Sequence, residues 1–124
     1  PSNPFISIDP ILALPGVRSA LQDCAAPVVA VTPIVHGEAI KGPTAKMMRE
    51  LDIETTAVAV ARHYADIIDG FVLDAADADI ASQVEALGIK TITTNTVMDS
   101  LDDRVMLARD VLEFCHQISP PAGD

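Results

Sequence analysis

The first residues of the chain place small polar side chains around a proline. Ser2, Asn3 and Ser7 carry hydroxyl and amide groups that donate or accept hydrogen bonds, and Pro4 lies between them. Because the prolines of residues 1–15 lack an N–H and restrict the residue before them, the pattern predicts a stiff, extended loop suited to binding a ligand. The alternative is a capped turn that leads into a helix, and the residues by themselves favour that alternative.

A second polar group consists of acidic residues. Asp74, Asp77 and Asp79 follow an apolar segment, and carboxylate oxygens are ligands of Mg²⁺. They are equally suited to capping a helix, and we favour capping, with Asp77 or Asp79 as the cap of a helix over residues 78–88. Asn95 follows the next apolar segment with the same two interpretations.

Basic and imidazole side chains follow the first predicted strand. Lys41 is placed to pair with a phosphate, and Lys46 to assist it, but two solvent-exposed lysines on an acidic protein are the favoured interpretation. His36 lies in the same loop, and His63 is expected to be a surface or satisfied core histidine. The six glycines are dispersed, without the Gly-rich turn that opens many nucleotide-binding domains.

Charge and composition narrow the class of protein. The chain has 124 residues and a formal net charge of −10, which argues against a nucleic-acid partner. Any bound phosphate must therefore be held by backbone N–H groups, a few cations or a metal. No signal peptide or membrane-length apolar run is recognisable, so we expect no membrane partner. Cys24 and Cys115 lack metal-ligand spacing and are predicted to be small core residues of a cytoplasmic protein.

The elements that position these residues alternate along the chain. Apolar, β-branched segments predict strands within 28–33, 70–75 and 89–94, and residues 34–43 read as a loop. Helical spacing and caps predict helices over 16–23, 44–52, 56–67, 78–88 and 100–117. Thr55 or Thr56 is expected to cap the third of these helices, Gly70 to close it, and Ser100 to cap the last.

This alternation is typical of an α/β fold with a Rossmann-like parallel sheet and flanking helices. Three strands are few for such a sheet, so we predict only the C-terminal part of a larger doubly wound domain. Residues 1–118 form this portion and residues 119–124 a flexible tail. The last helix is expected to bury a stripe formed by Leu101, Val105, Ala108, Leu112 and Cys115.

Taken together, several segments resemble one enzyme family. The segments SNPFISIDPILALPGVRSAL, APVVAVTPIV, AIKGPTAKMM, ETTAVAVARHYADIIDGFVLD and LGIKTITTNTVM occur in this order and resemble the C-terminal part of the 2-phospho-L-lactate transferases of coenzyme F420 biosynthesis. The chain departs from the family pattern at His36-Gly37, where Gly-Gly is usual, and at Asn95-Thr96, where Asp-Thr is usual.

The resemblance implies a transferase of the phosphotransferase class. It moves a phospholactyl-type or phosphoenolpyruvyl group from a guanylyl diphosphate donor to the deazaflavin Fo, releasing GMP, with Mg²⁺ as cofactor. The implied donor-binding residues are Ser2, Asn3, Pro4, Ser7 and Lys41. The Gly-rich phosphate loop, the Fo site and the metal ligands are expected in an N-terminal half, so these residues alone are expected to be inactive.

Several alternatives stay open at this point. Phospholactate, phosphoenolpyruvate and phosphoglycerate are equally compatible with the residues as the transferred group. A second copy of the chain is a further partner to consider. The alternative function is a non-catalytic regulator that binds nucleotides or UDP-sugars, from a related family that shares the scaffold, and fold alone does not choose between them.

Overall fold

The centre of the protein is a parallel sheet of three strands in the order β1-β4-β5. The structure, a computed structural model, describes residues 4–39 and 43–119. The strands are β1 (Val29–Val31), β4 (Gly70–Asp74) and β5 (Lys90–Thr94), with Val29 opposite Gly70 and Val72 opposite Ile92. This confirms the predicted Rossmann-like α/β class and all three predicted strands, although β1 is shorter than expected.

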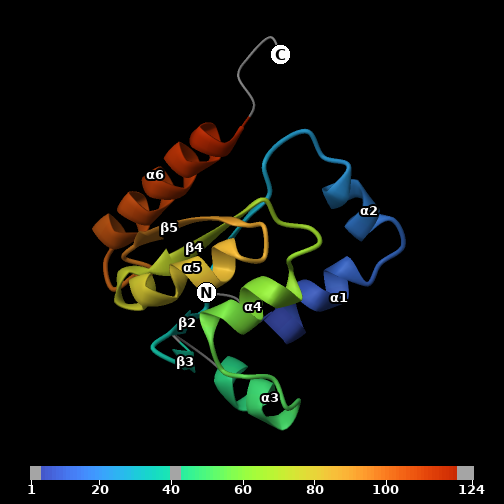
Figure 1. Ribbon diagram of the computed structural model, residues 1–124, viewed down its shortest axis with the longest axis horizontal. Helices are drawn as coiled ribbons and strands as arrows, with labels where there is room; N and C mark the ends of the chain where they lie inside the picture. Colours follow the sequence, from blue (N-terminus) through green and yellow to red (C-terminus); the bar gives the residue numbers. More distant parts are fainter. Residues whose placement is uncertain (1–3, 40–42, 120–124) are drawn as a thin grey trace.

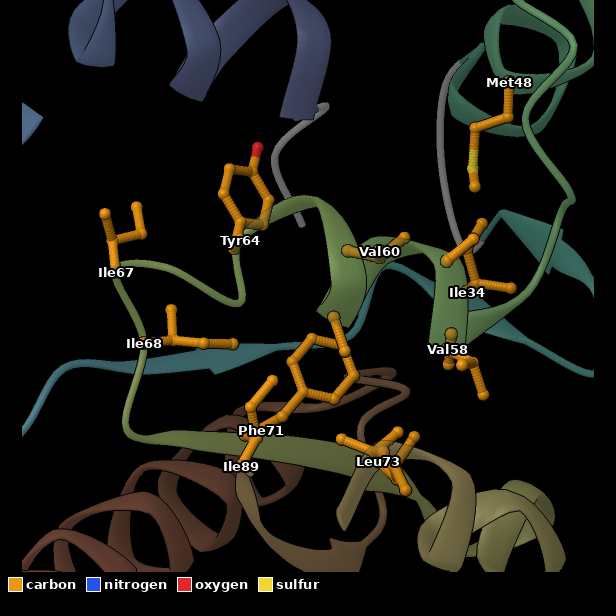
Figure 2. Close-up of a cluster of buried hydrophobic side chains, with 14 of the residues drawn as sticks. Ile34, Met48, Val58, Val60, Tyr64, Ile67, Ile68, Phe71, Leu73 and Ile89 are labelled. Carbon is orange, nitrogen blue, oxygen red and sulfur yellow. The ribbon is translucent and has the colours of Figure 1, made fainter. Parts of the chain in front are cut away.

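Helices cover both faces of this sheet (Figure 1). On one face, α4 (Ala57–His63) and α5 (Ala81–Glu85) pack with Phe71 and Leu73 of β4. Figure 2 shows these two side chains beneath Val58 and Val60 of α4. On the other face, α6 (Leu101–Ile118) packs on Val72. Because β4 is buried on both faces, Phe71, Val72 and Leu73 follow one another as apolar residues without alternation, as in other parallel sheets.

The chain that was expected to be a loop after β1 forms a hairpin instead. Strands β2 (Ile34–Val35) and β3 (Glu38–Ala39) pair antiparallel across His36 and Gly37. These two residues have φ values of +50° and +75°. Positive φ at both central residues is the geometry of a type I′ turn, which matches the twist of paired strands and favours glycine. Residues 40–42 of the predicted loop lie outside the described residues.

The N-terminal segment is helical, which corrects the predicted extended loop. A π-helix (Pro4–Ile8) leads into α1 (Asp9–Leu12), which is followed by α2 (Val17–Gln22). Pro10 lies in the first turn of α1, where a helix does not use the N–H that proline lacks. The alternative that the residues favoured, a turn that leads into a helix, is therefore closer to the observed structure.

Two further helices lie between β3 and β4. Helix α3 (Thr44–Glu50) presents Met48 toward Ile34 (Figure 2). Thr56 caps α4 by accepting a hydrogen bond from Ala59 N at 3.1 Å, as predicted. The helix ends at His63 rather than near residue 67, because the chain turns at Tyr64 to reach β4. Gly70 therefore begins a strand and does not close the helix.

The apolar face of α6 is not the predicted one. Leu107 and Phe114 are buried against the sheet, whereas Leu101 and Leu112 of the predicted stripe are 71% and 62% exposed. The sheet favours the face with Phe114, because Gly70 has no side chain and admits the ring against its backbone. Ser100 caps α6 by accepting from Asp103 N, as predicted.

Three other expectations can be compared with the described residues. Cys115 is half-buried but Cys24 is exposed, so Cys24 is not a core residue. Within the part of the chain that is described, no helix combines the length and apolar character needed to cross a bilayer. The predicted boundary at residue 118 coincides with the end of α6. The flexible tail stays a prediction, since residues 120–124 lie outside the described residues.

The contact between Gly70 and α6 predicts a large effect for Gly70→Ala. A Cβ at this position would lie 2.7 Å from Cε2 of Phe114, closer than carbon atoms pack. We expect the free energy of unfolding to fall by about 1–3 kcal/mol, as for other overpacked cores. Urea denaturation measures this value. In a protein that already carries Phe114→Leu, Gly70→Ala should lower the free energy of unfolding by less than it does alone. Strictly additive losses of unfolding free energy in the double variant would contradict the contact.

Candidate functional site at the carboxyl ends of the strands

Polar residues gather where the three parallel strands end. Thr32 follows β1, Asp74 ends β4, and Thr96 follows β5, and all three side chains are buried. In open α/β sheets, ligands bind in the crevice outside the carboxyl ends of the strands. This edge is therefore the candidate functional site of the chain.

Asp74 is the most highly bonded side chain at this edge. Its Oδ1 accepts hydrogen bonds from the backbone N–H and the hydroxyl of Thr96, both at 2.9 Å. Its Oδ2 accepts from Ala76 N at 2.9 Å. Burial raises the pKa of Asp74, but these hydrogen bonds and the nearby His36 outweigh burial and lower it below its ordinary value. Asp74 is thus an ionised carboxylate that joins β4 to the segment after β5.

Asp77 has a comparable role for the β2–β3 hairpin. It is buried, and its carboxylate accepts from His36 N, with 3.1 Å between that nitrogen and Oδ2. The His36 ring lies beside the same carboxylate, with Nδ1 3.8 Å from Oδ1. The prediction that Asp77 or Asp79 caps the helix was wrong in detail. Asp74 caps the 3₁₀-helix Ala75–Ile80, and the residue before α5 makes no side-chain cap.

The acidic residues do not form a metal site among themselves. Across residues 4–39 and 43–119, no three His, Cys, Asp or Glu side chains are grouped to hold an ion. The oxygens of Asp74 and Asp77 are used by backbone N–H groups, which favours the capping interpretation. The described residues therefore do not fit a Mg²⁺ ion.

An apolar groove of about 390 Å³ runs beside this edge and along β1. Residues 28–33 line it, together with Pro4 and Leu12 from the N-terminal segment and Thr96 and Met98 after β5. Of the predicted donor-binding residues, Pro4 is buried and lines the groove, whereas Ser7 is exposed and is not among the lining residues. Ser2, Asn3 and Lys41 lie outside the described residues.

The remaining polar candidates have structural or surface positions. Thr32 Oγ1 donates to Ile34 O at 2.9 Å and shapes the turn from β1 into the hairpin. Asn95 is exposed and accepts from Val97 N in a local turn. Lys46 is also exposed, with Nζ 3.9 Å from Glu50 Oε1. The favoured interpretation of Lys46 as a surface lysine is confirmed.

The carboxylate of Asp9 holds the N-terminal segment, which forms one wall of the groove, in place. Asp9 accepts a hydrogen bond from the Tyr64 hydroxyl at 2.9 Å and lies 2.8 Å from Nε2 of His63. Figure 2 shows the Tyr64 hydroxyl pointing toward the N-terminal segment. Burial raises the pKa of Tyr64, and the bond to Asp9 raises it further, so the hydroxyl remains a donor. This contact was missed, because a sequence separation of 55 residues gives no local signal.

The fold and the site together define an α/β unit of Rossmann-like type whose polar carboxyl edge is the candidate ligand-binding site. The chain belongs to the 2-phospho-L-lactate transferase CofD family, whose model matches residues 1–120.

Named relatives agree with this assignment. A phosphoenolpyruvate transferase of Streptomyces griseus is 39% identical over 119 residues, which are 95% of this chain and 37% of the relative. A 2-phospho-L-lactate transferase of Methanocaldococcus jannaschii is 40% identical over 115 residues, which are 93% of this chain and 35% of the relative. The chain thus spans little more than a third of the length of these relatives.

The Asp74 network predicts a pH-dependent loss of stability in Asp74→Asn. The amide cannot accept from all three donors, so we expect unfolding free energy to fall by about 1–3 kcal/mol at pH 7. Since the folded pKa of Asp74 is lowered, its stabilisation is present above the unfolded pKa of about 3.9 and is lost as pH falls through the folded value. The difference between wild type and variant should therefore shrink below about pH 4.

Urea denaturation at pH 7 and at acidic pH provides the measurement. Asp79→Asn is the matched control, because Asp79 lies on the same segment and is exposed. An equal loss in both variants, or a difference that does not change with pH, would contradict the role assigned to Asp74.

The Asp9 contact predicts that Tyr64→Phe loosens the N-terminal wall. Loss of a hydrogen bond to a charged group should lower the unfolding free energy by about 1.5–3 kcal/mol. Amide exchange in residues 9–12 should accelerate more than exchange in β4. An unchanged exchange rate in α1 would show that Tyr64 does not hold this segment.

Proposed function

We propose that the complete protein transfers a phospholactyl-type or phosphoenolpyruvyl group from a guanylyl diphosphate donor to the deazaflavin Fo. GMP is the leaving group, and the product lies on the route to coenzyme F420. The observation that carries this proposal is the family match over residues 1–120. The polar carboxyl edge of a Rossmann-like sheet supports it, since nucleotide ligands bind at such edges.

The proposal assigns the donor to the end of the groove that Pro4 lines. Pro4 is buried and lines the groove along β1, and it directly follows Ser2 and Asn3 in the chain. Ser7 is exposed and accessible to a ligand. The family resemblance supplies the full set of proposed donor-binding residues, which is Ser2, Asn3, Pro4, Ser7 and Lys41.

The chemistry requires positioning and charge compensation. Phosphoryl-group transfer brings a hydroxyl in line with a diphosphate and stabilises negative charge on its oxygens. The net charge of −10 makes a diphosphate an unfavourable ligand unless local donors or cations compensate it. We propose Mg²⁺ as that cation, which would neutralise charge on the transferring group, with ligands outside the described residues.

The identity of the transferred acid is a separate part of the proposal. Relatives named for phosphoenolpyruvate and for 2-phospho-L-lactate match the chain with 39% and 40% identity. Because these identities do not distinguish a phosphoenolpyruvate donor from a 2-phospho-L-lactate donor, both of these donors and the phosphoglycerate donor belong in the test. The proposed full-length protein acts without a nucleic acid or a membrane, in the cytoplasm, as a single copy or a homodimer.

A chimaeric transferase tests the function. The 119 matched residues of this chain replace the corresponding segment of the Streptomyces griseus relative, and the product is purified and shown to melt cooperatively. We expect GMP release from at least one guanylyl donor only when Fo and Mg²⁺ are present. The isolated chain should release none.

Variants of the chimaera test the donor site. Ser2→Ala and Asn3→Ala should raise the KM for the donor at least about tenfold, which corresponds to about 1.4 kcal/mol of lost binding. Ser82→Ala, on α5, is the control. A folded chimaera that releases no GMP from any of the three donors would refute the transferase, and preferential binding of a UDP-sugar over GDP would favour a regulator.

A further inference from the structure

The N-terminal segment borders a second cavity besides the apolar groove. This cavity has a volume of about 300 Å³, and Pro4 lines both it and the groove. We call it the α3–α4 cavity, because its lining includes Met48 of α3, residues 52–54 between the two helices, and His63 of α4, together with Phe5 of the π-helix. The functional site described above uses none of these residues except Pro4.

The inner part of the α3–α4 cavity suits a planar ring. Its lining includes the side chains of Met48, Ala59 and Val60, all of which are buried. Two rings also line it, those of Phe5 and His63, with 5.6 Å between their centroids and 58° between their planes. Apolar side chains and aromatic rings bind nucleobases by stacking and edge contacts.

Polar side chains at the mouth of the cavity are available to a ligand. Asp52, Glu54 and Arg62 line the cavity and are exposed. Within the described part of the chain, none of these three side chains forms an ion pair. Asp52 has a φ value of +56° and follows the end of α3, a position where left-handed residues commonly turn the chain out of a helix. The cavity therefore offers two carboxylates as acceptors and one guanidinium as a donor.

This set of groups matches the edge of a guanine ring. Guanine presents an acceptor, O6, beside two donors, N1–H and the 2-amino group, so a guanidinium and carboxylates can satisfy all three. Adenine presents one amino donor beside a ring-nitrogen acceptor. A pyrimidinedione edge, such as that of a deazaflavin, presents a single N–H between two carbonyl oxygens, which the two carboxylates would repel. The chemistry of the cavity thus favours guanine over either of these rings.

We infer that the α3–α4 cavity binds the guanine ring of the guanylyl donor, with Asp52 and Glu54 accepting from N1–H and the 2-amino group and Arg62 donating to O6. The inference rests on the proposed function for the identity of the nucleotide as a donor. The place of Pro4 in the chain supports it, since Ser2 and Asn3 directly precede this residue. Two residues span at most about 7 Å, so the base and the phosphates of one nucleotide can contact the same segment.

Titration of the 124-residue chain with GMP, IMP and AMP, followed by NMR, tests the inference. IMP retains O6 and N1–H but lacks the 2-amino group. We expect GMP to shift the amide signals of Phe5, residues 52–54 and His63. IMP should bind at least about tenfold more weakly than GMP, which is about 1.4 kcal/mol, and AMP more weakly still.

A double variant then tests the two carboxylates. Asp52→Asn with Glu54→Gln keeps the size of both side chains, and asparagine adopts a positive φ as aspartate does. Each amide has one acceptor oxygen and adds N–H donors that face the donors of guanine. The ratio of GMP affinity to IMP affinity should therefore fall to about one, an effect that a loss of stability alone would not produce. Glu50→Gln is the control, because Glu50 is exposed on α3 and does not line the cavity.

Three results of the titration would overturn the inference. They are equal affinities of the unsubstituted chain for GMP and IMP, GMP-induced shifts that omit residues 52–54, and a folded chain that does not bind GMP. An unchanged ratio in the double variant would remove the two carboxylates from the site.

The chimaeric transferase separates this inference from the proposed function. There the double variant should raise the KM for the guanylyl donor at least about tenfold and leave kcat unchanged. GMP release with an unchanged KM would overturn the guanine site while the transferase stands. Selective GMP binding by the chain, without GMP release from any donor by the chimaera, would refute the transferase while the guanine site stands.

Discussion

The burial of β4 is the constraint on which the rest of this structure depends. All five of its residues, Gly70–Asp74, are buried, and a parallel strand in this position needs neighbours on both sides and cover on both faces. Helices α4 and α5 supply one cover and α6 the other. Because the carboxyl group of Asp74 ends this strand, the same burial brings the polar groups of three strand ends together.

The acidic residues at the site act on the fold before they act on any ligand. The carboxylates of Asp74, Asp77 and Asp9 each accept hydrogen bonds from distant segments, and each joins a loop or helix to the sheet region. Buried carboxylates of this kind are stable because their charge is satisfied by N–H and O–H donors. These hydrogen bonds leave the carboxyl edge polar. The groups that bind phosphate in the proposed reaction must be residues other than these three carboxylates.

The apolar groove lies at the end of the sheet. The chain spans about 37% of a relative, and among the described residues the sheet ends at β1, which lines this groove. The groove and the candidate ligand edge share Pro4, Thr32 and Thr96. The groove and the candidate ligand edge therefore meet at one surface, at the carboxyl ends of the strands, where ligands bind in doubly wound folds.

The sequence by itself determined the α/β class, the three strands, the Ser100 cap and a cap of α4 at Thr55 or Thr56, because these depend on local composition and spacing. Its resemblance to the transferases also identified the family. Only the tertiary structure decided that α6 buries Phe114 rather than Leu112, since that choice depends on the space above Gly70, 44 positions away along the chain. The hydrogen bond that the Tyr64 hydroxyl donates to Asp9 of the N-terminal segment was equally hidden, because contacts between distant residues leave no periodic pattern in the sequence.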